Sequence, residues 1–131
     1  MKNRNSLLCL VMVMLLSACA GGPGVEKEQA VTDTATGTGR AVTTLLAKSS
    51  TQIEAGEWEK AAALLERALR IEPRNAKLWQ RLAEVRLSQG QYSQAESLAT
   101  KSNSLAPQDQ ALQEKNAQII RQARMARGQM G

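Results

Sequence analysis

Residues 56–73 read GEWEKAAALLERALRIEP, and residues 90–107 read GQYSQAESLATKSNSLAP. The two segments lie 34 residues apart, and each begins with glycine, has an aromatic residue two places later and ends with proline. A period of about 34 residues that carries these landmarks in this order is typical of stacked helical hairpins. Such arrays present extended concave surfaces to other proteins. The repeat therefore predicts a helical protein that binds partners.

Apolar residues spaced three and four apart predict five helices in this part of the chain. A glycine is expected to end the first and third helices. A proline is expected to end the second and fourth, because proline cannot donate an amide and restricts the residue before it. The five helices are expected to begin near Arg40, Trp58, Leu78, Tyr92 and Gln108. The fifth ends near Ala126, and its expected buried face consists of Leu112, Ile119, Ile120 and Met125.

These residues resemble the tetratricopeptide repeat family, whose pattern has large, small, glycine, aromatic, alanine and proline positions in fixed order. Counted from Ala76, the matching residues of the second repeat are Trp79, Leu82, Ala83, Gly90, Tyr92, Ala95 and Pro107. Counted from Val42, those of the first are Leu45, Lys48, Ser49, Gly56, Trp58, Ala61 and Pro73. Lys48 stands where the pattern has leucine, so the first helix is expected to be a solvated cap or to be slightly shifted in register.

The resemblance implies an all-α fold, a short α-solenoid of about two helical hairpins and a C-terminal capping helix. The expected domain covers residues 40–127, and its parts are repeat one at 41–75, repeat two at 76–109 and the cap at 110–127. Two repeats are fewer than the three that usually give a stable array. The domain is therefore expected to be marginally stable and to gain stability from a partner or from self-association.

In this family the first helix of each hairpin lines a concave groove. The corresponding residues of repeat one are Thr43, Leu46, Ser50 and Ile53, and those of repeat two are Lys77, Gln80, Glu84 and Leu87. The cap is expected to add Glu114, Gln118 and Arg121. Some members hold a carboxylate with lysine, arginine and asparagine, but the matching positions here are Leu46, Ser50, Arg81, Ala111 and Lys115, so that clamp is largely absent. The expected ligand is a peptide segment or helix with an apolar anchor.

The first residues of the chain predict an export signal. Lys2 and Arg4 precede an apolar run that is too short to span a bilayer, which needs about 20 apolar residues. The run ends in Leu16-Ser17-Ala18-Cys19, which resembles the lipobox of bacterial lipoproteins. This resemblance implies a signal peptide at 1–18, lipidation of Cys19 and, because Ala20 and not aspartate follows, sorting to the outer membrane. Residues 19–39 are rich in glycine and threonine and are expected to form a disordered tether that faces the periplasm.

The composition argues against catalysis and nucleic-acid binding. The chain has no histidine, and its two cysteines are Cys9 in the signal and Cys19 at the lipidation site, so no metal site and no cofactor are expected. The net charge of +5 is not arranged as a basic stripe with interleaved aromatic residues. The last helix carries four cations, which are either a solvated helix end or a patch for an acidic partner, lipid headgroups or peptidoglycan: Lys115, Arg121, Arg124 and Arg127.

Two functions fit an outer-membrane lipoprotein with this domain. Small repeat-bearing lipoproteins that activate bifunctional penicillin-binding proteins, or scaffold other enzymes of peptidoglycan remodelling, look like this chain. Pilotin-like assembly factors for an outer-membrane secretin or type IV pilus are the alternative, although they usually carry more repeats. Both functions require a periplasmic or membrane-anchored protein of the cell envelope as the partner.

Overall fold

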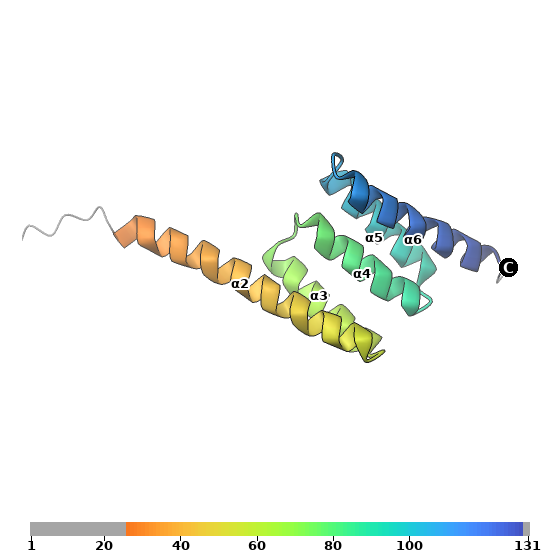
Figure 1. Cartoon of the computed structure of the whole chain (residues 1–131), viewed down its shortest axis with the longest axis horizontal. Coiled ribbons are helices and arrows are strands. Elements are labelled where there is room, and N and C mark those ends of the chain that lie inside the picture. Colours follow the sequence, from red (N-terminus) through yellow and green to blue (C-terminus); the bar gives the residue numbers. More distant parts are fainter. Residues whose placement is uncertain (1–25, 130–131) are drawn as a thin grey trace, which may run out of the picture. The chain divides into compact units, whose positions relative to one another are not determined.

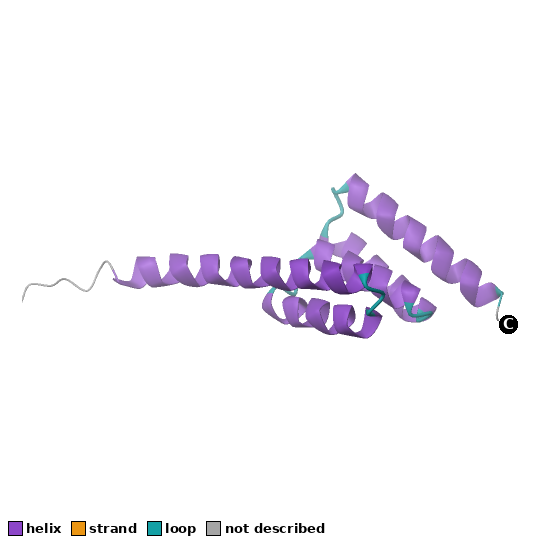
Figure 2. Cartoon of the chain, turned by 60° about the horizontal axis from the view of Figure 1, so that its bottom comes forward, coloured by secondary structure: helices purple, strands orange, loops and turns teal. Residues whose placement is uncertain are grey.

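The protein, described here from a computed structural model that places residues 26–129, consists of α-helices joined by short loops (Figures 1 and 2). In chain order the helices are α2 (Glu26–Glu54), α3 (Trp58–Ile71), α4 (Ala76–Ser88), α5 (Tyr92–Leu105) and α6 (Gln110–Gly128). The described residues contain no strand, which confirms the expected all-α class. The chain divides into two compact units, Met1–Ala35 and Thr36–Gly131. The core and the sites described below belong to the second unit.

Glycine makes the turn inside each hairpin. Gly56 and Gly90 have φ angles of +72° and +74°, a left-handed conformation that side chains with a Cβ atom rarely adopt. At the first turn Glu57 donates its amide to the carbonyl of Gln52 at 2.8 Å, and at the second Gln91 donates to Arg86 at 2.9 Å. Such bonds satisfy carbonyls that the helix end leaves unpaired. The matching geometry confirms the 34-residue repeat predicted from the sequence.

The hairpins are joined by loops that contain Pro73 and Pro107, and side chains cap the helices that follow. The Oδ1 atom of Asn75 accepts the amide of Lys77 at 3.1 Å at the start of α4. The Oδ1 atom of Asp109 accepts the amide of Leu112 at 3.0 Å at the start of α6. Each cap satisfies one amide that has no partner inside its helix. The caps fix where α4 and α6 begin, and both helices contribute to the site below.

The larger part of the core lies between the first hairpin and α4. It is built from aliphatic side chains and alanines of α2, α3 and α4: Val42, Leu45, Ala61, Ala62, Leu65, Ala68, Leu69, Leu78, Leu82 and Val85. Leu65 and Leu78 are completely buried. Because α4 contributes to this cluster and also contacts α5 and α6, it is the central helix of the domain.

A second cluster joins the second hairpin to the cap. Its buried members are Ala83 of α4, Ala95 and Ala99 of α5, and Ile119 of α6. The three alanines are fully buried, and their small side chains allow the helices to approach closely. Ala83 and Ala95 therefore lie where the two helices of this hairpin pack together.

A buried amide also holds the cap in place. Asn116 of α6 is fully buried, and its Nδ2 atom donates to the Oγ atom of Ser102 at 2.9 Å and to the Oδ1 atom of Asn103 at 2.7 Å. Ser102 in turn donates to the backbone carbonyl of Ala76 at 2.8 Å. Since buried polar groups are costly without partners, this network favours one register of α4, α5 and α6.

Lys48 is exposed on α2 and is compatible with the fold. Its counterpart Leu82 is buried because α4 packs against the preceding hairpin. Within the compact unit α2 is the first helix, so its equivalent surface has no preceding hairpin to contact. The neighbouring residue Ser49 is fully buried and donates its hydroxyl to the carbonyl of Leu46 at 2.7 Å. The sequence interpretation of a solvated first helix therefore fits the structure better than a shift in register.

Two features differ from the sequence expectations. α2 begins at Glu26 and not near Arg40, so residues 26–39, expected to belong to a disordered tether, are helical. No proline interrupts them after Pro23, and the last turns continue directly into a packed helix. Met125 is 61% exposed, because the buried face of α6 continues from Ile119 to Ala123, four residues later. Met125 lies six residues after Ile119, which is about 240° around the helix.

Candidate partner-binding groove

One face of the domain is hollowed into a groove of about 810 Å³. We call it the α2–α4–α6 groove, because it is lined by the first helix of each hairpin and by the cap. The second helices of the hairpins, α3 and α5, contribute none of its lining residues. Helices that repeat every 34 residues present equivalent positions along such a face.

Most of the groove residues predicted from the sequence lie in this groove. Those that line it are Thr43, Leu46, Ser50, Lys77, Gln80 and Glu84. Ile53 and Leu87 do not, because they are partly buried against the two core clusters. Gln118 and Arg121 do not either, and Glu114 is likewise absent from the lining, so the cap contributes only its first turns. Six of the eight positions predicted from the two repeats therefore line the hollow, and none of the three predicted from the cap does. That a partner binds there stays a prediction.

The sequence reasoning did not count the sixth position of the repeat among the groove residues, although it named Arg81, Ala111 and Lys115 as positions of the missing carboxylate clamp. Ala47, Arg81 and Lys115 are spaced by 34 residues, and all three line the groove. They occupy the sixth position when the 34-residue repeat is counted from Val42, Ala76 and Gln110, immediately after the predicted Leu46 and Gln80 in the first two repeats. The same period places Ala111 beside Thr43 and Lys77 as the equivalent of the second position. The 34-residue period relates these positions to one another, so identifying one of them as part of the groove would have identified the other two.

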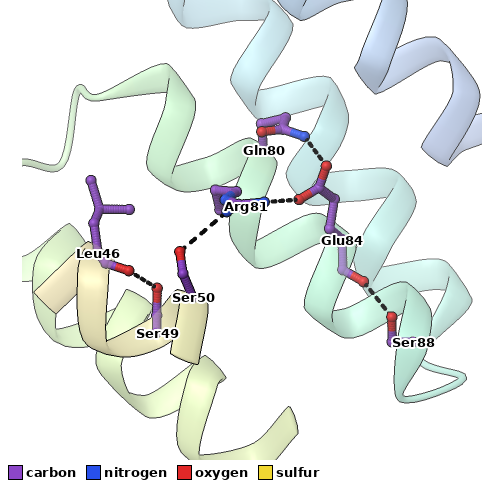
Figure 3. Close-up of polar contacts among 7 residues, drawn as sticks. All are labelled: Leu46, Ser49, Ser50, Gln80, Arg81, Glu84 and Ser88. Carbon is purple, nitrogen blue, oxygen red and sulfur yellow. Dashed lines mark hydrogen bonds and ion pairs between the residues drawn. The ribbon is translucent and has the colours of Figure 1, made fainter. Parts of the chain in front are cut away.

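A polar network joins α2 to α4 across the groove (Figure 3). The Nη1 atom of Arg81 lies 3.0 Å from Oε2 of Glu84, and its Nη2 atom donates to the hydroxyl of Ser50 at 3.3 Å. Gln80 donates its side-chain amide to the other oxygen of Glu84, Oε1. A carboxylate held by two donors has little rotamer freedom left to lose on binding. Arg81 and Glu84 therefore form a preorganised part of the groove wall.

The remaining charges make one end of the groove cationic. Lys77 and Lys115 are exposed and form no ion pair with any described residue. The carboxylate of Asp109 caps α6, and that of Glu84 is paired with Arg81. Both acids of the lining are thus engaged, whereas both lysines are available to an incoming ligand. Leu46, Ala47 and Leu112 supply apolar surface beside them.

The four cations expected to form a patch on the last helix are not in one cluster. Arg124 and Arg127 approach Glu96 of α5 at 2.7 Å and 3.4 Å, so one carboxylate offsets half of their combined charge. Lys115 lies nine residues before Arg124, which is about 180° around the helix, and faces the groove instead. Arg121 is exposed and forms no ion pair with the described residues. The four residues therefore do not lie together on one side of α6, and binding of an anionic partner by any of them stays a prediction.

The described residues carry no sign of a metal or membrane-spanning site. No three or more histidine, cysteine, aspartate or glutamate side chains among residues 26–129 are grouped to hold a metal ion. No helix in the same part of the chain combines the length and the apolar character that crossing a membrane requires. Cys19, the predicted lipidation site, lies outside the described residues.

The helical hairpins and their concave groove define a repeat protein of the tetratricopeptide class, and comparison with known proteins agrees. The tetratricopeptide repeat family model matches residues 52–119, and the chain belongs to this family. A solved structure, the globular C-terminal domain of P. aeruginosa LpoP, is 42% identical to the chain with a TM-score of 0.65. The alignment covers 66% of this chain and 82% of that chain. No curated protein sequence matches the chain significantly.

Proposed function

We propose that this protein is an adaptor anchored in the outer membrane that binds and activates a bifunctional penicillin-binding protein from the periplasm. The observation that carries the proposal is the 42% identity to the C-terminal domain of LpoP over most of that domain. The sequence independently resembles repeat-bearing lipoproteins that activate such synthases. The same likeness supports an adaptor without catalytic activity of its own.

The α2–α4–α6 groove is the proposed interface. Its volume of about 810 Å³ suits a short peptide segment or one face of a helix. Leu46, Ala47 and Leu112 would receive an apolar anchor, while Lys77 and Lys115 would attract an acidic residue beside it. Activation then follows from linkage: an adaptor that binds the active conformation of the synthase more tightly than the inactive one increases the population of the active conformation.

The proposed anchor is a lipidated Cys19 after removal of residues 1–18. A lipid-attached chain is confined to one membrane, so the domain meets a synthase rooted in the opposite membrane only within the reach of the connecting residues. The helix that begins at Glu26 shortens this reach relative to a disordered tether, because a helix rises about 1.5 Å per residue and an extended chain about 3.3 Å. For the pilotin-like alternative, neither the groove nor the comparisons provide a supporting observation.

Substituting Ala47 by glutamate tests the groove as the activating surface. Ala47 is exposed and lines the groove, so the added carboxylate would stand where an apolar anchor is expected without entering the core. We expect binding of the bifunctional penicillin-binding protein to weaken by about tenfold or more, and stimulation of its glycan polymerisation to fall accordingly. The measurements are the dissociation constant by calorimetry and the polymerisation rate with lipid-linked substrate.

The matched control is the same substitution at Ala63, which is exposed on α3 and does not line the groove. Ala63→Glu adds the same charge and should leave both the dissociation constant and the stimulation within about twofold of the unmodified protein. Equal effects of the two substitutions would show that the groove is not the interface. A synthase that binds the domain but is not stimulated would contradict the activating role.

A further inference from the structure

A second, shallower hollow lies on the outer face of the first hairpin. It has a volume of about 430 Å³ and is formed by α2 and α3. Three cations line it, Arg40 and Lys48 of α2 and Arg67 of α3. Ala41, Leu45 and Ile71 form its apolar floor. We call this surface the α2–α3 basic face, and it shares no residue with the α2–α4–α6 groove.

The charge of this face is unbalanced. No acidic residue lines it. None of the three cationic side chains forms an ion pair with a carboxylate that the structure describes. Some cations elsewhere on the domain are paired, such as Arg86 with Glu66 and Arg124 with Glu96, whereas others, such as Lys77 and Lys115 of the groove, form no ion pair with a described residue. Positive charges that lie together without an acidic neighbour attract anions. The basic face therefore has the electrostatic character of a site for an anionic partner.

The short distance in sequence between this face and Cys19 indicates which kind of anionic partner it binds. Arg40 and Lys48 lie on α2, the described helix nearest to Cys19 in the sequence, and 20 residues separate Cys19 from Arg40. If Cys19 carries the anchor, the first hairpin is the part of the domain that the chain keeps nearest to the bilayer. Basic residues close to an anionic membrane surface each contribute about 1 kcal/mol to binding.

We propose that the α2–α3 basic face docks on anionic phospholipid headgroups, with Arg40, Lys48 and Arg67 contacting their phosphate groups. The proposal rests on the anchoring part of the proposed function and is independent of the groove. Because the two surfaces have no residue in common, headgroup contact leaves the groove open to a partner. The contact would hold the domain at the membrane between encounters with the synthase.

Vesicle binding by the domain without its anchor tests the proposal. Residues 36–131 form one compact unit that contains both core clusters, and the related LpoP structure is of a C-terminal domain alone. The probes are vesicles of phosphatidylcholine and vesicles that also contain phosphatidylglycerol. We expect the domain to sediment with the anionic vesicles only, and the combined variant Arg40→Gln, Lys48→Gln, Arg67→Gln to lose binding by about tenfold or more.

A variant with the same net charge serves as the control. It combines Arg74→Gln, Lys101→Gln and Arg121→Gln, three exposed cations that line neither hollow, and should bind anionic vesicles within about twofold of the unmodified domain. Equal losses in the two variants would overturn the proposal, because they would indicate attraction by net charge alone. Displacement by free glycerol phosphate would also overturn it in favour of a soluble phosphate ligand. Synthase binding by the groove is measured without vesicles. The groove proposal and the headgroup proposal can therefore be refuted independently of each other.

Discussion

Replacing Leu78 by alanine is expected to lower the free energy of unfolding of the domain by about 3 kcal/mol. Leu78 is completely buried and belongs to the cluster that α4 shares with the first hairpin. The smaller side chain loses the transfer free energy of its methyl groups and leaves a cavity among residues of different helices. In a domain of this size such a loss lowers the melting temperature by roughly 12–24 °C. Thermal and urea unfolding followed by circular dichroism measure the effect.

The control is the substitution of Met125, the one large hydrophobic side chain that is exposed among residues 36–129. Met125→Ala also shortens an apolar side chain, but it should change the free energy of unfolding by less than about 0.5 kcal/mol. Similar losses for both variants would contradict the packing described here. Thermal unfolding of the unmodified domain also tests whether two repeats give only marginal stability. A monomer with a melting temperature above about 80 °C would rule out that hypothesis.

Replacing Ala95 by leucine is expected to destabilise the domain by about 2 kcal/mol or more. Ala95 of α5 is fully buried in the cluster that also contains Ala83 and Ile119. Alanine and leucine have similar helix propensities, so the loss comes from packing and not from the helix itself. The added carbons can be accommodated only if α5 moves away from its neighbours. Because α6 packs on this hairpin, the cap should also become more labile, which amide hydrogen exchange of α6 would detect.

Gln94 provides the matched position one residue earlier on the same helix. It is exposed, so Gln94→Leu adds the same side chain on the solvent side and should leave stability within about 0.5 kcal/mol. If Ala95→Leu is as stable as the unmodified domain and α6 exchanges no faster, the close approach of the helices at this alanine is not required.

The helical repeat could be predicted from local sequence because its determinants are local. The bounds of α3 and α5 agree with the residues expected from the apolar spacing. Glycine at a positive φ angle and proline after the second helix act through the backbone itself, so they mark the same turns in both repeats. Six groove residues, three in the second half of α2 and three in α4, followed from the same period. The complete list of groove residues could not be predicted in this way, because it depends on where the cap begins and on how α6 packs.

The features that were missed depend on contacts between helices. The pairing of Arg124 and Arg127 with Glu96 joins residues of α6 and α5, and no short-range pattern reports it. The exposure of Met125 depends on which side of α6 meets α5, and Ala123 is too small to mark that side in the sequence. The α2–α3 basic face likewise requires residues from two helices. Lys48 looked like a defect in the repeat and is one of the three cations of that face.

The central claim is that the α2–α4–α6 groove receives the synthase, and backbone amide chemical shifts of the isotope-labelled domain test it most directly. The periplasmic region of the bifunctional penicillin-binding protein from the same organism is titrated into residues 36–131. We predict that the largest shift changes fall around Ala47, Arg81 and Lys115, which line the groove at equivalent positions of the repeat. Changes confined to α3 and α5, or no changes at saturating synthase, would contradict the claim.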